Sequence, residues 1–483
     1  MDETAKIHPL IINQAYMTYL FPWSFHEKER KSLIDCLLTS DFTFFTLDQK
    51  ELEDDLYGNN IQVKHEELDQ YFLPFIERKL FPHRTNQKGF LRFSKRINNT
   101  FTMLVHDTNF TFRVNSIDVM ICPFGIGFIT IRTEMDQRDE QLSELLDFMN
   151  HFRVLEPKLD EEKGATIQKN EQIFQTTNEF VFEYLCPEIK SFIIHDDKRS
   201  GYFGSLPFFE DERMLSAGFL IANDEQPIKV DHLYRMGQLN GKNPEGKPFM
   251  SSTNLEYLER YVQKHVHDRW APDSYTVTSE HTQITVSLKS TEQLITPISQ
   301  FMGTHHYNLM LHYFYKIMLF RLSFEYSEIK WEKDEDYVEE LIELISKFSS
   351  HYYFGEVSAR TEGKELSHTY REIFHLDNLY EEVRQTLNEL YRAQENQASK
   401  RHNMLLFMLT VFTVISGIYG MNLVIEDWKG KTDWSKVPGY SFFEWISLIT
   451  ALVGISLSII LMATTGGKGL WKKFRKWKRD QYK

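Results

Sequence analysis

The chain has 483 residues, of which 42% are hydrophobic and 26% charged, so it can form a buried core and has the length of about three domains. Its three cysteines, Cys36, Cys122 and Cys186, lie far apart, which argues against a disulfide framework or a cysteine-built zinc site. The last 18 residues carry a net charge of +7, so residues 1–465 carry −21 of the total of −14. An acidic body of this kind disfavours nucleic acid as the main partner.

Residues 1–290 are predicted to form a cytosolic α+β domain of the α/β/α-like kind, because short alternating segments mix with helical patterns. The first strands expected are a pair at 101–106 and 111–120. A turn at ICPFG then leads into a third strand at 128–134. Further elements are predicted in chain order as helices at 139–154 and 171–185, a strand at 217–222, a helix at 254–267 and a strand at 282–288.

Residues 291–402 are predicted to form a helical and stalk region. Apolar or aromatic side chains recur there every three or four residues, at Leu366, Tyr370, Ile373, Leu376, Tyr380, Val383, Leu387 and Leu390. With no helix-stop signal between Asn388 and Met404, the pattern predicts one continuous helix of about 50 residues. A stripe of this kind must be covered by neighbouring helices or by other copies of the chain.

Two C-terminal segments, 403–425 and 445–467, each contain 23 residues without a formal charge. About 20 apolar residues are enough to cross a bilayer as a helix, so we expect transmembrane helices at 403–425 and 445–465. Lys400 and Arg401 precede the first segment and a basic cytoplasmic tail, 466–483, follows the second, which predicts a short external loop at 426–444 and both termini in the cytoplasm. The alternative is a pair of buried helices in a large soluble domain.

The first apolar segment carries a second stripe, at the same helical spacing, made mostly of small or polar residues. Its members are Ser399, Asn403, Leu406, Thr410, Thr413, Gly417 and Gly420. Such a stripe is typical of close helix–helix packing, and it is also typical of a pore lining. A pore lining would require an oligomer, because two spans per chain cannot enclose a pore.

The segment ends in Tyr419-Gly420-Met421-Asn422, followed by a short loop, a final apolar segment and a basic tail. In this order of features the chain resembles the CorA family of magnesium channels, specifically over residues 365–483. The resemblance implies a CorA-like funnel: a homopentamer with a central pore lined by the first span. It also implies a selectivity filter of Gly420, Met421 and Asn422, with Thr413 lining the pore and Asn396 near its inner mouth.

Three positions depart from the family pattern. Val411 stands where the family has a proline, and Thr410 where it has a pore methionine, so that Leu406 and Phe407 are the candidate gate. The acidic loop motif of the family is replaced by IEDW, with Glu426 and Asp427 as its acidic residues.

The function expected from these features is passive Mg²⁺ influx driven by the membrane potential, with hydrated Mg²⁺ selected by a ring of Asn422 side chains and also acting in regulation. The expected localisation is the plasma membrane, in a bacterial cell. The expected partners are other copies of the chain, membrane lipid, Mg²⁺ and Co²⁺; no nucleic acid, organic cofactor or catalytic site is expected. The alternatives are a Zn²⁺ or Co²⁺ transporter of the same superfamily and a membrane-anchored sensor or scaffold that conducts nothing.

Two further groups of residues are candidate metal sites. The histidines His265, His267, His305, His306 and His312 lack a cysteine or HExxH partner, which favours packing or surface roles. The acidic run Asp334-Glu335-Asp336 is one candidate for a weak Mg²⁺-sensing surface, against a solvated helix start.

Overall fold

The computed structural model describes residues 5–54, 56–105, 108–135, 140–157, 164–194, 213–224, 226–329, 335–420, 434–450, 452–454 and 456. The chain divides into two compact units, Met1–Gln385 and Thr386–Lys483. The first unit, called the sheet unit below, contains every strand of the part of the chain that is described.

A single mixed sheet of 12 strands organises the sheet unit, in the order β10-β11-β12-β9-β1-β5-β4-β3-β7-β8, with β2 paired to β3 and β6 paired to β1. The strands are β1 (Ile11–Ser24), β2 (Thr43–Phe44), β3 (Leu91–Val105), β4 (Thr108–Ile121), β5 (Ile126–Met135), β6 (Glu140–Gln141), β7 (Thr166–Lys169), β8 (Gln172–Phe174), β9 (Leu215–Ala222), β10 (Val266–His267), β11 (Ser274–Thr278) and β12 (Thr282–Ser287).

The N-terminal strand β1 lies in the middle of this sheet, between β5 and β9, and is antiparallel to both. The pair β9 and β12 runs parallel, so the chain must cross over between them. Eleven of the fourteen residues of β1 are buried, including its last ten. The sheet is therefore covered on both faces along its central strand.

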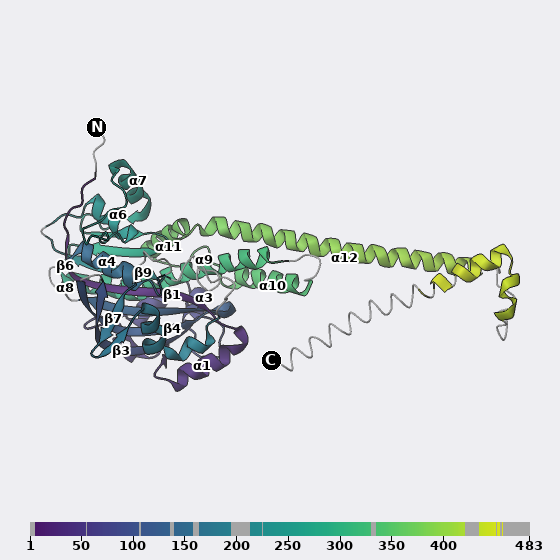
Figure 1. Cartoon of the computed structure of the whole chain (residues 1–483), viewed down its shortest axis with the longest axis horizontal. Helices are drawn as coiled ribbons and strands as arrows, with labels where there is room; N and C mark the ends of the chain where they lie inside the picture. The colour runs from purple at the N-terminus through teal and green to yellow at the C-terminus, as the bar shows by residue number, and fades with distance from the viewer. Residues whose placement is uncertain are drawn as a thin grey trace. The chain divides into compact units, whose positions relative to one another are not determined.

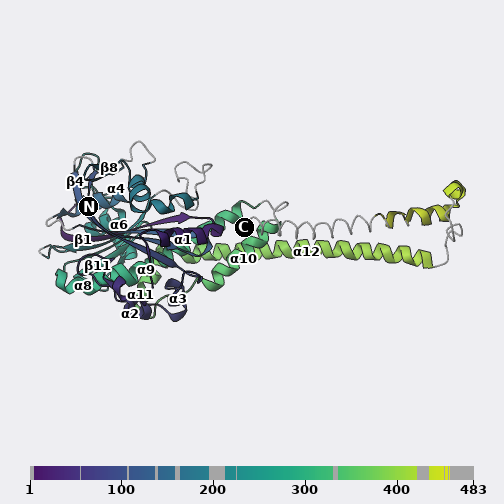
Figure 2. The same ribbon diagram turned by 90° about the horizontal axis from the view of Figure 1, so that it is seen from below.

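Alternate residues of each strand point to opposite faces. On one face, the ring of Tyr19 packs 4.5 Å from that of Phe152 in α4 (Leu142–Phe152), and Phe21 packs 6.1 Å from Phe182. On the other face, Phe128 lies 5.8 Å from Tyr313 in α9 (His306–Ser327). Figure 2 shows α4 on one side of the strands, and on the other side α9 together with α8 (Thr291–Gln300) and α11 (Thr361–Ile373).

The α-helices in chain order are α1 (Arg30–Thr39), α2 (His65–Tyr71), α3 (Pro74–Leu80), α4 (Leu142–Phe152), α5 (Thr177–Glu179), α6 (Val230–Gln238), α7 (Leu255–His265), α8 (Thr291–Gln300), α9 (His306–Ser327), α10 (Glu335–His351), α11 (Thr361–Ile373) and α12 (Leu376–Gly420). The shorter helical turns are η1 (Glu27–Glu29), η2 (Lys50–Glu53), η3 (Pro123–Gly125), η4 (Phe180–Leu185), η5 (Pro187–Phe192), η7 (Phe301–His305) and η9 (Trp434–Gly439).

The long helix predicted from Leu366 onward is divided in two. α11 ends at Ile373, and His375 has a positive φ of 53°, a left-handed conformation that interrupts a right-handed helix. α12 then continues for 45 residues without a break (Figure 1). The prediction of one helix across residues 374 and 375 is wrong, and the uninterrupted passage from residue 376 into the apolar segment is confirmed.

The predicted fold class, an α/β/α-like body followed by two C-terminal transmembrane helices in a CorA-like funnel, is corrected by the structure. The body is built on one large mixed sheet, because strands far apart in sequence pair edge to edge. Among the described residues, no helix combines the length and apolar character needed to cross a membrane. The spans at 403–425 and 445–465, the transmembrane-transporter description and the plasma-membrane localisation are therefore not supported.

Most of the individual elements predicted in the sheet unit are present. The pair at 101–106 and 111–120 corresponds to β3 and β4, which run antiparallel and are longer than expected, and the third strand is β5. The helix predicted at 171–185 is wrong in its first part, because Gln172–Phe174 forms a strand paired with β7. The sequence did not indicate β1. The predicted domain boundaries stay a prediction.

Candidate functional site

The predicted pore-lining residues all lie on α12. Asn396, Ser399, Asn403, Leu406, Thr410, Thr413 and Gly417 fall within Leu376–Gly420, and each is exposed in the single chain. Their spacing of three or four residues places them along one side of a continuous helix. We call these seven positions the polar stripe.

The two threonines of the polar stripe bond to their own helix. The hydroxyl of Thr410 donates to the carbonyl of Leu406 at 2.9 Å, and that of Thr413 donates to the carbonyl of Leu409 at 2.8 Å. Each hydroxyl proton is therefore used within the helix, and the oxygen lone pairs remain available as acceptors. Outward-facing acceptors suit the water molecules around a cation, because those waters present their hydrogens outward.

Large apolar side chains of α12 are exposed as well. Phe407, 69% exposed, and Leu409, 65% exposed, flank the polar stripe, and Met404, 59% exposed, lies on the opposite side of the helix. Exposed contiguous apolar surface of this kind marks an interaction surface.

The predicted selectivity filter is described only at its first residue. Gly420 is the last residue of α12. Met421 and Asn422 lie outside the described residues, as do the loop residues Glu426 and Asp427. The role of Asn422 as the residue that holds hydrated Mg²⁺ stays a prediction.

The five histidines considered as metal ligands are distributed over α7, β10, η7 and α9. His267 Nε2 lies 2.9 Å from a carboxylate oxygen of Glu365, and His305 Nε2 lies 3.9 Å from one of Glu362. His312 and His306 are buried in α9, where burial lowers the pKa of the first to about 4 and of the second to about 3. The Nδ1 atom of His265 lies 2.8 Å from the carbonyl oxygen of Tyr261, one turn earlier in α7. Within the described residues, no three His, Cys, Asp or Glu side chains are placed to share a metal ion.

The acidic run is only partly described. Glu335 and Asp336 begin α10, and Asp334 lies outside the described residues. Its assignment as a sensing surface stays a prediction.

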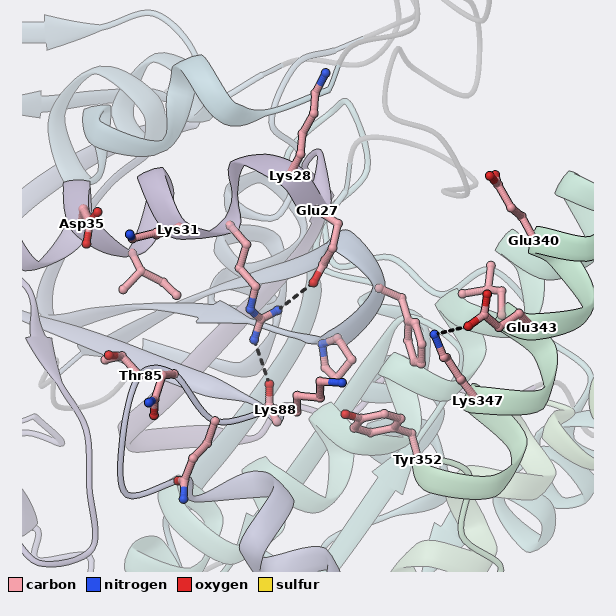
Figure 3. Close-up of a pocket in the computed structure, with 18 residues that line it drawn as sticks. Glu27, Lys28, Lys31, Asp35, Thr85, Lys88, Glu340, Glu343, Lys347 and Tyr352 are labelled. Carbon is pink, nitrogen blue, oxygen red and sulfur yellow. Dashed lines mark hydrogen bonds and ion pairs between the residues drawn. The ribbon is translucent and has the colours of Figure 1, made fainter. Parts of the chain in front are cut away.

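A charged cleft that the sequence analysis does not predict lies between α1, the segment 85–89, η3 and α10 (Figure 3). This cavity of about 780 Å³ is lined by five basic side chains and four acidic ones: Lys28, Arg30, Lys31, Lys88 and Lys347, and Glu27, Asp35, Glu340 and Glu343. Arg30 is fixed in its wall, because its guanidinium donates to the carbonyls of Cys122 at 2.8 Å and Gly89 at 3.3 Å. Across the cleft, Lys347 pairs with Glu343 at 2.6 Å.

The charges in this cleft nearly balance, so its electrostatics select neither an anionic nor a cationic ligand. No local sequence pattern predicts this cleft, because its lining residues on α1 and α10 are far apart in the sequence and come together only in the folded chain. The cleft has a defined shape but does not by itself indicate a function.

Comparison with models of known protein families, with curated proteins and with solved structures finds no match to this chain.

Proposed function

We propose that several copies of the chain associate through α12 and hold hydrated divalent cations, preferably Mg²⁺, along the polar stripe. The observation that carries the proposal is the stripe itself: seven positions on one side of a continuous helix, all exposed, with large apolar side chains beside them. Association of copies would bury the apolar flanks and leave the polar stripe around a common water-filled axis.

The chemistry of the polar stripe suits a hydrated ion. Mg²⁺ gives up its waters reluctantly, so it is best held through hydrogen bonds to those waters. Thr410, Thr413 and Asn403 offer neutral oxygens for this purpose. No carboxylate occurs between Asn403 and Ile425, so the ion would not be trapped by a strong charge.

The −21 charge of residues 1–465 supports a cationic ligand over an anionic one, because it raises the local concentration of cations around each copy. Ion binding along associated helices does not require a helix that spans a membrane. Pentameric assembly and passive Mg²⁺ conduction stay predictions of the sequence.

The proposal is tested with Mn²⁺ as a paramagnetic probe in place of Mg²⁺. Nitroxide labels are placed at Thr413→Cys on the polar stripe and at Met404→Cys on the opposite side of α12, both in a Cys36→Ser background. Mn²⁺ should broaden the spectrum of the label at 413 more than that at 404, and excess Mg²⁺ should reverse the effect.

Equal broadening at both positions would remove the polar stripe from the proposed function. Dilution to the monomer should abolish the difference, because one stripe alone does not surround an ion. If Zn²⁺ or Co²⁺ displaces Mn²⁺ at lower concentration than Mg²⁺ does, the alternative metal specificity is correct.

A further inference from the structure

Three charged side chains are buried together on the face of the sheet that is covered by α9. They come from three neighbouring strands: Arg92 from β3, Asp118 from β4 and Arg132 from β5. Arg92 and Asp118 are each 2% exposed and Arg132 is fully buried. Asp118 Oδ2 lies 3.0 Å from Arg92 Nε and 2.6 Å from an Nη of Arg132.

Strand register explains why they meet. Asp118 is opposite Ser94 of β3 and Thr130 of β5, and Ser116 is opposite Arg132. Residues spaced by two along a strand share a face, so this register places all of these polar side chains on one side of the sheet. We call Arg92, Asp118 and Arg132 the buried charge cluster.

Hydrogen bonds within the protein satisfy most of Arg92. Its guanidinium donates to the hydroxyls of Ser94 at 3.0 Å, Tyr57 at 3.0 Å and Tyr307 at 2.9 Å. One donor of Arg92, Nη2, has no protein partner.

Only one of the three guanidinium nitrogens of Arg132 has a hydrogen-bond partner in the protein. Its Nη1 pairs with Asp118 and lies 3.4 Å from the Ser116 hydroxyl. Its Nε and Nη2, both buried, have no protein partner. These two groups are adjacent donors of the planar guanidinium, and such a pair can bind both oxygens of a carboxylate side by side.

The cluster has a surplus positive charge, since two guanidinium groups face one carboxylate. The neighbouring side chains do not neutralise it. Glu134, two residues after Arg132, already accepts from Arg113 at 3.0 Å and from Asn115 at 3.1 Å. Burial raises the pKa of the Tyr307 phenol, which therefore stays neutral. An uncompensated buried charge is strongly unfavourable, and so are buried donors without partners.

From the surplus charge and the three orphan donors, we infer that the buried charge cluster binds a small monovalent anion, of the size of formate or a halide, against Nε and Nη2 of Arg132. The anion balances the second guanidinium and completes its hydrogen bonds. It is a structural ligand held by β5 on the face covered by α9, and the inference is independent of the function proposed for α12.

The test uses the full chain and measures its thermal unfolding midpoint in sodium formate, in sodium bromide and in sodium gluconate at equal ionic strength. Gluconate is too large for the site and serves as the control. A ligand of the folded state stabilises it by mass action, so the midpoint should rise by roughly 1–3 °C for each tenfold increase in formate or bromide above its dissociation constant. Equal midpoints in all three salts would overturn the inference.

Two variants locate the effect. Arg132→Gln should abolish the dependence on formate and bromide, whereas Arg113→Gln, which changes a more exposed arginine on β4, should leave it intact. Retention of the dependence in Arg132→Gln would place the anion elsewhere and refute the site.

Crystals of the wild-type chain soaked in bromide decide the matter even if Arg132→Gln fails to fold. An anomalous peak within hydrogen-bond distance of Arg132 Nε is expected. A water molecule there, with no bromide signal, would show that solvent alone satisfies the orphan donors.

Discussion

The apolar side chains of the sheet unit are mostly buried, whereas those on the C-terminal part of α12 are exposed. In the sheet unit, Trp23, Leu91 and Ile131 have no measurable exposure, and they belong to one continuous core. On α12 beyond Asn403, Phe407 and Leu409 are more than half exposed. A single copy of the chain thus completes the core of the first region, but it leaves the apolar surface of the second uncovered.

The largest effect in the sheet unit is expected on removing the carboxylate of the buried charge cluster. Asp118→Ala leaves Arg92 and Arg132 without the carboxylate that lies between them, which should lower the free energy of unfolding by about 3–5 kcal/mol. Burial opposes ionisation of Asp118, yet Arg132 and Arg92 outweigh it and lower its pKa. The stability that Asp118 contributes is therefore present at neutral pH and is lost as the pH falls below the ordinary pKa of an aspartate.

Urea denaturation followed by circular dichroism measures this effect. Glu245→Ala is the matched control, since Glu245 is 71% exposed and pairs with an exposed lysine. A loss of similar size in both variants would contradict the importance of burial.

A second change tests how tightly the core of the sheet unit is packed. A Cβ atom on Gly127 would lie 2.3 Å from the indole of Trp23, its cross-strand partner on β1. Gly127→Ala should therefore cost roughly 1–3 kcal/mol, because neither the buried ring nor the paired backbone can move freely. Gly355→Ala, at a position with open space around it, should change the unfolding midpoint little.

A third prediction concerns acid. Burial lowers the pKa of His312 to about 4 in the folded chain. As the pH falls, this side chain is therefore protonated near pH 6.5 in the unfolded chain, while it stays neutral in the folded chain. Stability should be constant above pH 7 and fall by about 2 kcal/mol between pH 7 and pH 5 for this one group. His312→Leu should reduce the slope of stability against pH, with part of it remaining through His306, whereas replacing the exposed His351 with Gln should not.

A fourth prediction concerns the exposed apolar side chains of α12 and their role in self-association. Leu409→Asp should weaken self-association by roughly tenfold or more, because burying a leucine side chain is worth about 1.5–3 kcal/mol. The unfolding midpoint of the sheet unit should stay the same. Sedimentation velocity measures association, with Gln394→Asp as a control of equal charge change at an exposed position of α12. Unchanged association in Leu409→Asp would show that α12 is not the contact between copies.

The sequence predicted most of β4 and β5 and the last third of β3, because their apolar residues alternate, as in TFRVNSIDVM. It gave no such signal for β1, in which apolar residues run nearly without alternation and Pro22 would ordinarily argue against a central strand. Pairings between β1 and β9, or between β9 and β12, join residues far apart in sequence, and no local pattern encodes them.

For the candidate site, the spacing of Ser399 to Gly417 was enough to predict one exposed stripe on one helix. The apolar runs suggested membrane spans, which the described residues do not provide. The buried charge cluster and the charged cleft could not be predicted, because a lone Arg92 or Arg132 in an alternating strand is indistinguishable from a solvent-facing residue until the covering helix is known.

The central position of β1 has a consequence for how the protein is made. This strand is synthesised before its two neighbours, β5 and β9, which begin only at Ile126 and Leu215. At about 5–20 residues per second, synthesis of the residues from Ser24 to Leu215 takes roughly 10–40 s. During that time this long apolar strand has at least one unpaired edge, and two until β5 is made, and an unpaired edge is prone to wrong pairing with other nascent chains. Chaperones that bind extended apolar segments should therefore be needed most by the segment that forms β1.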